Sequence, residues 1–272
     1  MRKLIYKIAI ILISAMLVTA FSVQAVAEQK NKYNATVKNK QIFLNGKQLT
    51  KSASEKSQPV VSPDNKKVLF IATTKVSIKL GVVDIKTKAE RIINIKDTFP
   101  QIMHIEWLSN SKAGVLLHIN PGLENYLTYD INTGKIIDSF YGYSFIYDKS
   151  MTHILYILAP PHFSSEKGSY TVMLDQASLY KTDGKTALDN SLYPSASFKR
   201  IAFFEYSAED KTKSKIVILS IENNKVKSKV KITWNKSICE LKWKNDDFLS
   251  IGNAASYDLK KSKLTMSGSE NK

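Results

Sequence analysis

The sequence contains few of the residues on which several common classes of protein depend. Its 272 residues include one cysteine, Cys239, so an internal disulfide framework is excluded. Glycine and proline number only 10 and 7, which excludes collagen-like chains and chains dominated by flexible linkers. Cys239 alternates with Leu241 and Trp243, so we expect it to lie buried and unreactive on the apolar face of a strand. A nucleophilic thiol or an intermolecular disulfide is the alternative.

Catalytic and metal-binding motifs are missing as well. The sequence has no Gly-x-Ser-x-Gly nucleophile elbow, no His-Glu-x-x-His pair and no Cys-x-x-Cys pair. Gly184-Lys185-Thr186 resembles the end of a phosphate-binding loop, but Leu179 stands where that loop needs a glycine, so we interpret it as a turn. The four histidines are far apart in the sequence. We therefore predict neither a metal site nor a cofactor.

Acidic residues are outnumbered, with 24 Asp and Glu against 40 Lys and Arg and a formal charge of +16. Removal of Arg2, Lys3 and Lys7 with a leader segment lowers this charge to +13. Such a field attracts polyanions, and we expect an anionic envelope polymer, a glycan or an envelope protein as partner. Nucleic acid is disfavoured, because no recognition-helix, RNA-binding or zinc pattern accompanies the charge. The lysines are scattered, and the alternative is a charged surface that serves solubility alone.

Residues 1–27 have the pattern of a secretory signal peptide. Arg2, Lys3 and Lys7 precede an apolar run at 8–21, and Ala25-Val26-Ala27 forms a small-x-small cleavage site. The run is shorter than the roughly 20 apolar residues that a membrane-spanning helix needs. We therefore expect a secreted or cell-envelope protein with no transmembrane helix after cleavage. An uncleaved anchor is the alternative.

The mature chain repeats one pattern, which is clearest in Ser62-Pro63-Asp64-Asn65-Lys66-Lys67-Val68-Leu69-Phe70-Ile71-Ala72. Ser, Pro, Asp and Asn are turn-forming residues, and the apolar run after them predicts a strand that is covered on both faces. Weaker copies have turns near residues 109, 148, 197 and 245, a period of about 45 residues with four expected strands each. This period predicts an all-β chain, a β-propeller of five or six four-stranded blades. A β-sandwich is the alternative.

The expected domain organisation follows from this repeat. Residues 28–57 hold short hairpins, including an Asn45-Gly46 turn, and we expect them to form part of the closing blade. They either supply strands of a sixth blade or close the ring by pairing with the segment near Lys263-Leu264-Thr265. The blades occupy residues 58–266, and residues 267–272 form a disordered tail.

Two segments resemble a known family of propellers. Ser62-Pro63-Asp64-Asn65-Lys66-Lys67-Val68-Leu69-Phe70 is similar to the Ser-Pro-Asp-Gly-Lys-x-Ile-Ala-Phe core of the TolB-type, PD40-repeat propellers. Leu80-Gly81-Val82-Val83-Asp84-Ile85-Lys86-Thr87-Lys88 resembles the strand that follows in that repeat. The sequence lacks the α/β domain of TolB and the hydrolase domain of prolyl-oligopeptidase relatives. The resemblance therefore implies the fold and neither an activity nor a partner.

Long loops on one face of such a propeller are the expected place for a site, because loops on a rigid scaffold carry function. The longest are at 120–125, 160–169 and 208–214. Amphipathic rings in this set suit contact with a carbohydrate or a peptide. The candidate ligand-binding residues are Asn120, Glu124, Tyr141, Tyr143, His162, Phe163 and Tyr193. The alternative is that the rings pack between blades.

Three functions remain open at this point. We expect an exported binding or scaffolding module at the cell envelope. The first alternative is a propeller enzyme, a glycan or peptide hydrolase or lyase, in which carboxylates such as Glu106, Glu205 and Glu240 converge in the channel. The second is a protein held on the cell wall by charge alone, whose retention falls steeply with salt.

Overall fold

The computed structural model describes residues 33–95, 101–120, 123–158, 168–189, 191–207, 210, 214–234, 236 and 239–267. The predicted signal peptide at 1–27 lies outside the described residues, as does most of the predicted tail at 267–272. All regular structure within the described ranges is β-strand. No helix among these residues is long and apolar enough to cross a membrane.

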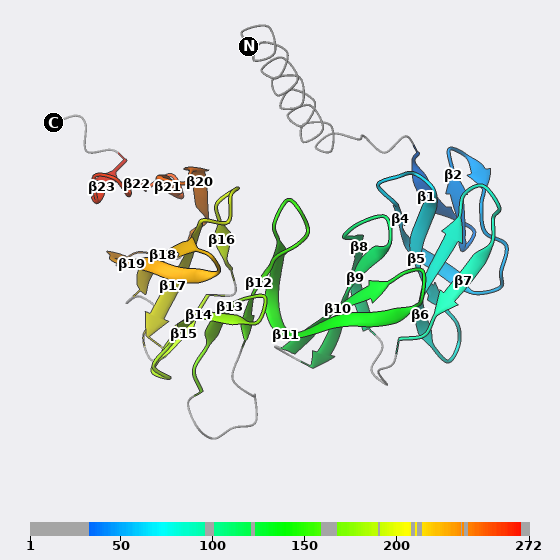
Figure 1. Cartoon of the computed structure of the whole chain (residues 1–272), viewed down its shortest axis with the longest axis horizontal. Coiled ribbons are helices and arrows are strands. Elements are labelled where there is room, and N and C mark those ends of the chain that lie inside the picture. The colour runs from blue at the N-terminus through cyan, green and yellow to red at the C-terminus, as the bar shows by residue number, and fades with distance from the viewer. Residues whose placement is uncertain are drawn as a thin grey trace, which may run out of the picture. The chain divides into compact units, whose positions relative to one another are not determined.

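The strands form five sheets in which most neighbours are consecutive along the chain (Figure 1). The amino-terminal sheet has β1 (Ala35–Lys38), β2 (Gln41–Leu44) and β3 (Lys47–Gln48), and the next has β4 (Glu55–Val61), β5 (Lys67–Thr73), β6 (Ile78–Asp84) and β7 (Glu90–Ile93). The largest has β8 (Gln101–Trp107), β9 (Lys112–Asn120), β10 (Leu123–Asp130), β11 (Lys135–Tyr147), β12 (Ile154–Leu158), β13 (Thr171–Leu174) and β14 (Ala177–Lys181). The fourth has β15 (Thr186–Leu188), β16 (Tyr193–Pro194), β17 (Arg200–Ser207), β18 (Ser214–Glu222) and β19 (Lys225–Trp234). The last has β20 (Leu241–Asn245), β21 (Phe248–Ile251), β22 (Ala255–Asp258) and β23 (Lys263–Met266).

Contacts divide the chain into two compact units. The first comprises Met1–Pro100, His104–Ala113 and Asp130–Lys135, and it holds β1 to β7. The second comprises Gln101–Met103, Gly114–Tyr129 and Ile136–Lys272, and it holds β12 to β23.

The predicted four-stranded repeat is present. β4 to β7 form one such group and β20 to β23 another, each with four strands in sequence order. In the fourth sheet β15 and β16 both pair with β17, so together they serve as one interrupted first strand. The segment at 263–265 lies in β23, which pairs with β22, and the alternative in which this segment also pairs with the amino-terminal hairpins is not seen among the described strands. Those hairpins pair with one another instead, and no closed ring is detected among the described strands.

One strand differs from the predicted pattern, because two repeats share it. The predicted repeat of four strands places a break between the copies with turns near 109 and 148, but β11 runs across that break as 13 continuous residues and pairs with β10 and β12. The change of direction occurs inside the strand. Gly142 has φ +154°, Ser144 has φ +59°, and the register with β12 shifts between Tyr143 and Ile146. A β-bulge inside one strand therefore links the two copies of the repeat.

Gly142 makes this bulge possible, and we expect its replacement by alanine to destabilise the protein by about 2 kcal/mol. The added Cβ would lie 2.2 Å from the carbonyl oxygen of Ile157, and a backbone atom in a paired strand has little room to move. Gly46→Ala is the matched control, since Gly46 has φ +80° but no atom within 4 Å of the added Cβ. Urea denaturation compares the two. Equal losses for both variants would show that the close approach at Gly142 costs nothing.

The core lies between successive sheets, as alternation of side chains along the strands requires. On β17, Phe203 packs against residues of β12 to β14, whereas Phe204 packs against residues of β20 to β22. On β18, Val217 packs in the same cluster as Phe203, and Ile218 packs in the same cluster as Phe204. A strand with both faces covered reads as a continuous apolar run, which is why these strands show no alternation in the sequence.

The turn that opens the clearest repeat is held by its own side chains. The hydroxyl of Ser62 accepts a hydrogen bond from the N–H of Lys67 at 2.9 Å and donates one to Asp64 at 2.7 Å. Asn65 adopts the left-handed conformation, φ +57°, and its N–H donates to the carbonyl of Ser62 at 2.9 Å. These contacts explain the order of the turn residues, since Ser and Asp bond nearby backbone groups and Asn tolerates positive φ.

The same turn recurs twice in the second unit. Asp148 and Ser195 occupy the place of Ser62, and their side-chain oxygens accept hydrogen bonds from His153 N–H at 3.0 Å and Arg200 N–H at 3.2 Å. The backbone N–H of Asp148 donates to the carbonyl of His153, and that of Ser195 donates to the carbonyl of Arg200. The N–H of Ser62 donates to the carbonyl of Lys67 in the same way. The turns near 148 and 197 are therefore true copies of the first one, as predicted.

A second contact repeats once in each unit. Trp107 on β8 donates from Nε1 to the carbonyl of Val60 on β4 at 2.8 Å. Trp243 on β20 makes the equivalent bond to the carbonyl of Tyr193 on β16, also at 2.8 Å. Each bond joins the first strands of two successive four-stranded groups, so the indole ring sets how one group packs on the next.

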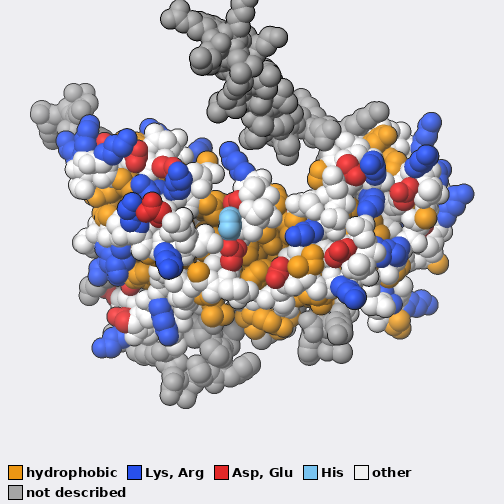
Figure 2. Space-filling view, in the orientation of Figure 1, with side chains coloured by type: hydrophobic (Ala, Val, Ile, Leu, Met, Phe, Trp, Pro, Cys, Tyr) orange, Lys and Arg blue, Asp and Glu red, His pale blue; other side chains and the backbone are white. Residues whose placement is uncertain are grey.

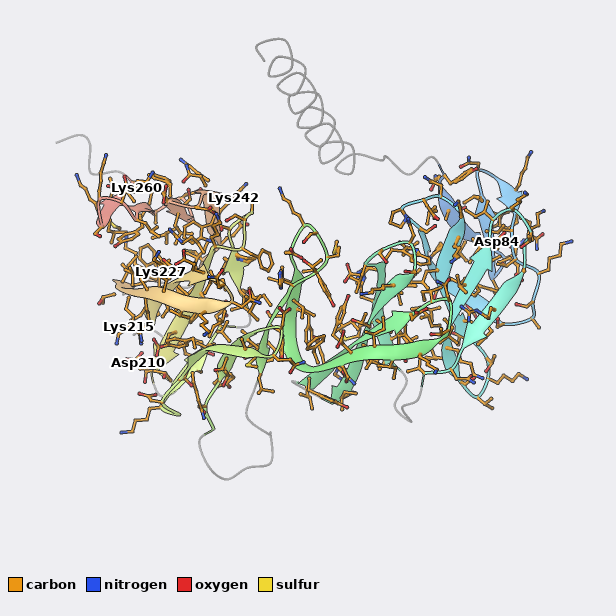
Figure 3. All side chains as sticks on the ribbon, in the orientation of Figure 1. Asp84, Asp210, Lys215, Lys227, Lys242 and Lys260 are labelled. Carbon is orange, nitrogen blue, oxygen red and sulfur yellow. The ribbon has the colours of Figure 1, made fainter. Side chains whose placement is uncertain are left out.

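Acidic turns complete the repeat at the same end of the sheets. Asp84, labelled in Figure 3, follows β6 and accepts hydrogen bonds from Thr87, from the N–H at 2.8 Å and the hydroxyl at 3.0 Å. These bonds hold the pKa of Asp84 below its usual value. Asp130 after β10 accepts from Asn132 and Thr133 in the same manner, at 2.8 and 3.0 Å.

The outer strands are exposed and rich in lysine. β19 carries Lys225, Lys227, Lys229 and Lys231 on alternate positions. Lysine on an edge strand discourages pairing with another chain. Figure 2 shows the Lys and Arg side chains dispersed over the visible surface of each unit instead of gathered in one block.

Candidate functional site

The predicted site residues fall into three groups. His162 and Phe163 lie outside the described residues, and Asn120 ends β9 without a described side chain. Glu124 on β10 is partly buried, which raises its pKa, and the nearby His118 opposes that rise. Tyr141 on β11 is 49% exposed.

The charge of Asp189, a residue outside the predicted set, acts on both Tyr143 on β11 and Tyr193 on β16. Burial raises the pKa of Tyr143, and the neighbouring Tyr170, Tyr206 and Asp189 raise it further. Burial likewise raises the pKa of Tyr193, with Asp189 adding to the effect. The hydroxyl of Tyr143 is buried with no hydrogen-bond partner in the described part of the chain. These two predicted residues therefore share one electrostatic neighbour, the carboxylate of Asp189.

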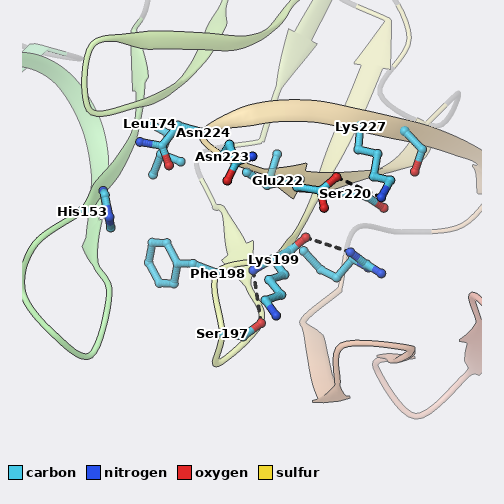
Figure 4. Close-up of a pocket in the computed structure, with 13 residues that line it drawn as sticks. His153, Leu174, Ser197, Phe198, Lys199, Ser220, Glu222, Asn223, Asn224 and Lys227 are labelled. Atoms are coloured by element: carbon cyan, nitrogen blue, oxygen red, sulfur yellow. Dashed lines mark hydrogen bonds and ion pairs between the residues drawn. The ribbon is translucent and has the colours of Figure 1, made fainter.

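A groove of about 810 Å³ lies in the second unit. It is formed where two kinds of turn meet, those after the first strand and those after the third strand of a four-stranded group. The residues that line it are His153, Leu174, Ser197, Phe198, Lys199, Arg200, Ser220, Ile221, Glu222, Asn223, Asn224, Lys227 and Ser228 (Figure 4).

Sequence reasoning missed this groove because each contributing segment reads as an ordinary turn. The copy Ser195-Ala196-Ser197-Phe198-Lys199-Arg200 was identified only as a marker of the fold. A signal was present, however. Lys199 and Arg200 after one turn and Lys225 and Lys227 after another belong to the same four-stranded group, and both turns must emerge at the same end of its sheet.

The charges lining the groove are mainly positive. Lys199, Arg200 and Lys227 face a single lining carboxylate, Glu222. Lys227 Nζ lies 2.9 Å from Glu222 Oε2, and this contact holds the pKa of Glu222 below its usual value. The guanidinium of Arg200 donates from Nη1 to the carbonyl of Lys199 at 3.1 Å. Its Nε–H is buried and has no acceptor among the described residues.

A carboxylate beside the groove, Asp246, is satisfied by its own neighbours. It accepts a hydrogen bond from the Ser197 hydroxyl at 2.6 Å. Burial alone would raise the pKa of Asp246, but bonds from Ser197 and Ser195 and the charges of Arg200 and Lys199 lower it below its usual value. Asp246 therefore fixes the turn beneath the groove and offsets part of the positive charge there.

His153 lines one side of the groove, and its imidazole ring is fixed by a contact with Asp175. Its Nδ1 lies 2.8 Å from Asp175 Oδ2, and Asn224 Nδ2 lies 3.5 Å from the same oxygen. The carboxylate orients the imidazole ring, which leaves the other ring nitrogen for a ligand. In the described part of the chain, no group of three His, Cys, Asp or Glu residues is arranged to hold a metal ion.

Of the carboxylates considered for catalysis, Glu205 has a clear structural partner. Its side chain is 7% exposed, and its Oε2 lies 2.6 Å from Lys231 Nζ. Tyr180 contributes a hydrogen bond to the same pair. Glu205 thus belongs to a buried network between β14, β17 and β19 and is not presented to a ligand.

Comparisons with known proteins show likeness at the level of the fold. No protein-family model matches the chain, and no curated protein matches it either. Among solved structures, a candidate dipeptidyl aminopeptidase IV from Bacteroides ovatus has a TM-score of 0.52 and 12% identity, covering 86% of this chain and 44% of that one. The β-propeller domain of the trilobed protease from Pyrococcus furiosus has a TM-score of 0.42 and 13% identity, covering 86% and 78%. An oligogalacturonate lyase from Vibrio parahaemolyticus has a TM-score of 0.42 and 12% identity, covering 83% and 70%.

The chain spans less than half the length of the first of these proteins, 44%. Identities of 12 to 13% carry no information on activity or ligand. The resemblance to TolB-type propellers stays a prediction, and so does the number of blades. The predicted fold class is confirmed: the chain is an all-β protein of the β-propeller class.

Proposed function

We propose that the protein is an exported binding module that holds an anionic polymer in the groove described above. The observation that carries this proposal is the convergence of Lys199, Arg200 and Lys227 on one groove that has a single lining carboxylate, Glu222. Ammonium and guanidinium groups form strong hydrogen bonds with the oxygens of phosphate and carboxylate groups. Export itself rests on the signal-peptide pattern at 1–27.

The net charge and the groove act at different ranges. Charges farther apart than the Debye length, about 8 Å at physiological salt, are largely screened from one another. The dispersed lysines of the +16 chain therefore favour encounter with a polyanion, but they do not fix its position. The groove supplies the short-range contacts that would do so.

The ionised state of Glu222, the carboxylate in the groove lining, favours binding over hydrolysis as the function of the groove. A glycosidase needs a carboxylic acid that is protonated near neutral pH and a second carboxylate at a set distance. Glu222 is the one carboxylate among the described lining residues, and Lys227 lowers its pKa. A group of this kind stays ionised and is a poor general acid.

Two exposed lysines of the groove test the proposal. We expect Lys199→Gln with Lys227→Gln to weaken binding of inorganic polyphosphate about tenfold at 0.1 M salt. The slope of log affinity against log salt should fall by about two, one for each lost phosphate contact. Isothermal titration calorimetry at several salt concentrations measures both quantities.

The matched control replaces two exposed lysines outside the groove. Lys215→Gln with Lys242→Gln removes the same net charge from the second unit (Figure 3). We expect this variant to bind polyphosphate within about twofold of the unaltered protein, because exposed charges contribute little at a distance. Equal losses in both double variants would mean that charge alone holds the polymer and that the groove is not a site.

A further inference from the structure

The groove contains one side chain that its charge does not explain, Phe198. The residue lies in the left-handed region with φ +58°, where a bulky side chain is a genuine outlier. Its ring is partly buried, lines the groove and packs against the core between β12 and β18. Strained residues of this kind occur at ligand-binding sites more often than elsewhere.

The turn itself does not require a phenylalanine. Asn65 occupies the equivalent place in the first unit with φ +57°, and both residues donate from N–H to the first turn residue at 2.9 Å. Asparagine adopts this conformation at little cost, which makes it the ordinary choice. Met151 is the third equivalent residue, with φ +56°. The turns that carry Phe198 and Met151 are the two that flank the groove. The first turn contributes Phe198 to the lining, and the second contributes His153.

The groove lining combines an aromatic ring, polar groups and cations. Figure 4 shows the ring of Phe198 directed toward His153, with Lys199 beside Phe198 and Lys227 farther along, next to Glu222. The amides of Asn223 and Asn224 and the hydroxyl of Ser220 also line the groove. A ligand in this groove would meet an aromatic ring, hydrogen-bonding groups of both kinds and ammonium groups.

We propose that the groove takes a phosphate-bearing sugar polymer, with a sugar ring against Phe198 and phosphate at Lys199 and Lys227. This inference rests on the proposed function, since it names the chemical class of the polyanion. A polyanion without rings would contact the lysines and would not contact the aromatic ring of Phe198. A sugar ring presents an apolar face to an aromatic side chain and hydroxyl groups to amides, which matches the kinds of groups that line the groove.

The test compares three ligands and three variants by isothermal titration calorimetry. The ligands are dextran phosphorylated to a defined degree, inorganic polyphosphate with the same number of phosphates, and unmodified dextran. Phe198→Asn installs the residue found in the equivalent turn of the first unit, and Phe198→Leu keeps an apolar side chain on the core without the aromatic ring. Met151→Asn is the matched control, because it makes the same change at the equivalent position outside the groove lining.

We expect both Phe198 variants to bind phosphorylated dextran about fivefold more weakly while their affinity for polyphosphate stays within about twofold. Met151→Asn should leave both affinities unchanged, and unmodified dextran should bind to none of the proteins. Unchanged affinity for phosphorylated dextran in Phe198→Leu, or an equal loss for both charged ligands, would overturn the sugar-phosphate inference alone. Failure of the unaltered protein to bind polyphosphate at all would overturn the proposed function, and this inference with it.

Discussion

Replacement of Lys231 by methionine is expected to lower the free energy of unfolding by about 3 kcal/mol at pH 7. Lys231 Nζ lies 2.6 Å from Glu205 Oε2, and the Glu205 side chain is 7% exposed. Without Lys231, the buried carboxylate of Glu205 loses its ion pair and keeps its contact with Tyr180. The value is at the low end for a broken buried pair, because the Lys231 side chain is 36% exposed and water screens part of the interaction.

The same pair predicts a dependence on pH. Burial alone would lower the pKa of Lys231, but its contacts with Glu205 and Tyr180 raise that pKa above the usual value of about 10.4. A lysine whose pKa is raised in the folded state stabilises that state fully at pH values below the pKa of the unfolded chain. This stabilisation is lost as the pH rises through the folded-state pKa. The difference in stability between the unaltered protein and Lys231→Met should therefore shrink above about pH 10.4.

Urea denaturation at pH 7 and at rising pH measures both effects, and a double variant provides the control. Glu205→Gln with Lys231→Met leaves no uncompensated charge, so we expect it to recover at least half of the loss. A single variant as stable as the unaltered protein would show that the pair contributes nothing. A double variant less stable than Lys231→Met would show that the loss comes from packing and not from the buried charge.

The second large effect is expected at Lys56, whose side chain is fully buried. Its Nζ donates to the carbonyl of Ser52 at 2.5 Å and to that of Ser54 at 2.6 Å. Glu90 Oε2 lies 3.9 Å from the same nitrogen, and Glu90 also accepts from the N–H groups of Lys51 and Ser52 at 2.7 and 3.1 Å. Burial lowers the pKa of Lys56, and Glu90 opposes that effect. One ammonium group thus anchors the whole connection between β3 and β4.

Lys56→Met is expected to destabilise the first unit by about 2 to 3 kcal/mol, because two carbonyls and a carboxylate lose their buried donor together. Lys51→Met is the matched control in the same connection, since the Lys51 side chain is exposed and only its backbone N–H is used. That control should stay within about 0.5 kcal/mol of the unaltered protein. Thermal unfolding monitored by circular dichroism compares them, and equal melting temperatures for both variants would contradict the anchoring role.

The features that could be predicted from the sequence are those that local chemistry decides. The turn at Ser62 and its copies at Asp148 and Ser195 were identified from residue type, because the hydrogen bonds that form each turn join residues at most five apart. The uninterrupted apolar runs of β5 and β17 indicated strands with both faces covered, and both strands are buried along most of their length.

The features that could not be predicted depend on which segments meet in space. β11 continues through Gly142 because partners on both sides hold it as a strand, and no local pattern shows those partners. Tyr143 and Tyr193 are candidate site residues because of their rings, yet Asp189, whose charge acts on both, carries no signal of its own in the sequence. The groove has the same origin, since Phe198 and Lys227 come to line one groove only through the pairing of β17, β18 and β19.

Hydrogen exchange of the protein with and without inorganic polyphosphate tests most directly whether the cationic groove is the binding site. We expect exchange to slow at 197–200 and 222–228, the two segments that carry most of the groove lining. The turn at 62–67 is an internal control, because it has the same hydrogen bonds in the other unit and should exchange at an unchanged rate. Slowing confined to Tyr143 and Tyr193, or spread equally over both turns, would contradict the groove as the site.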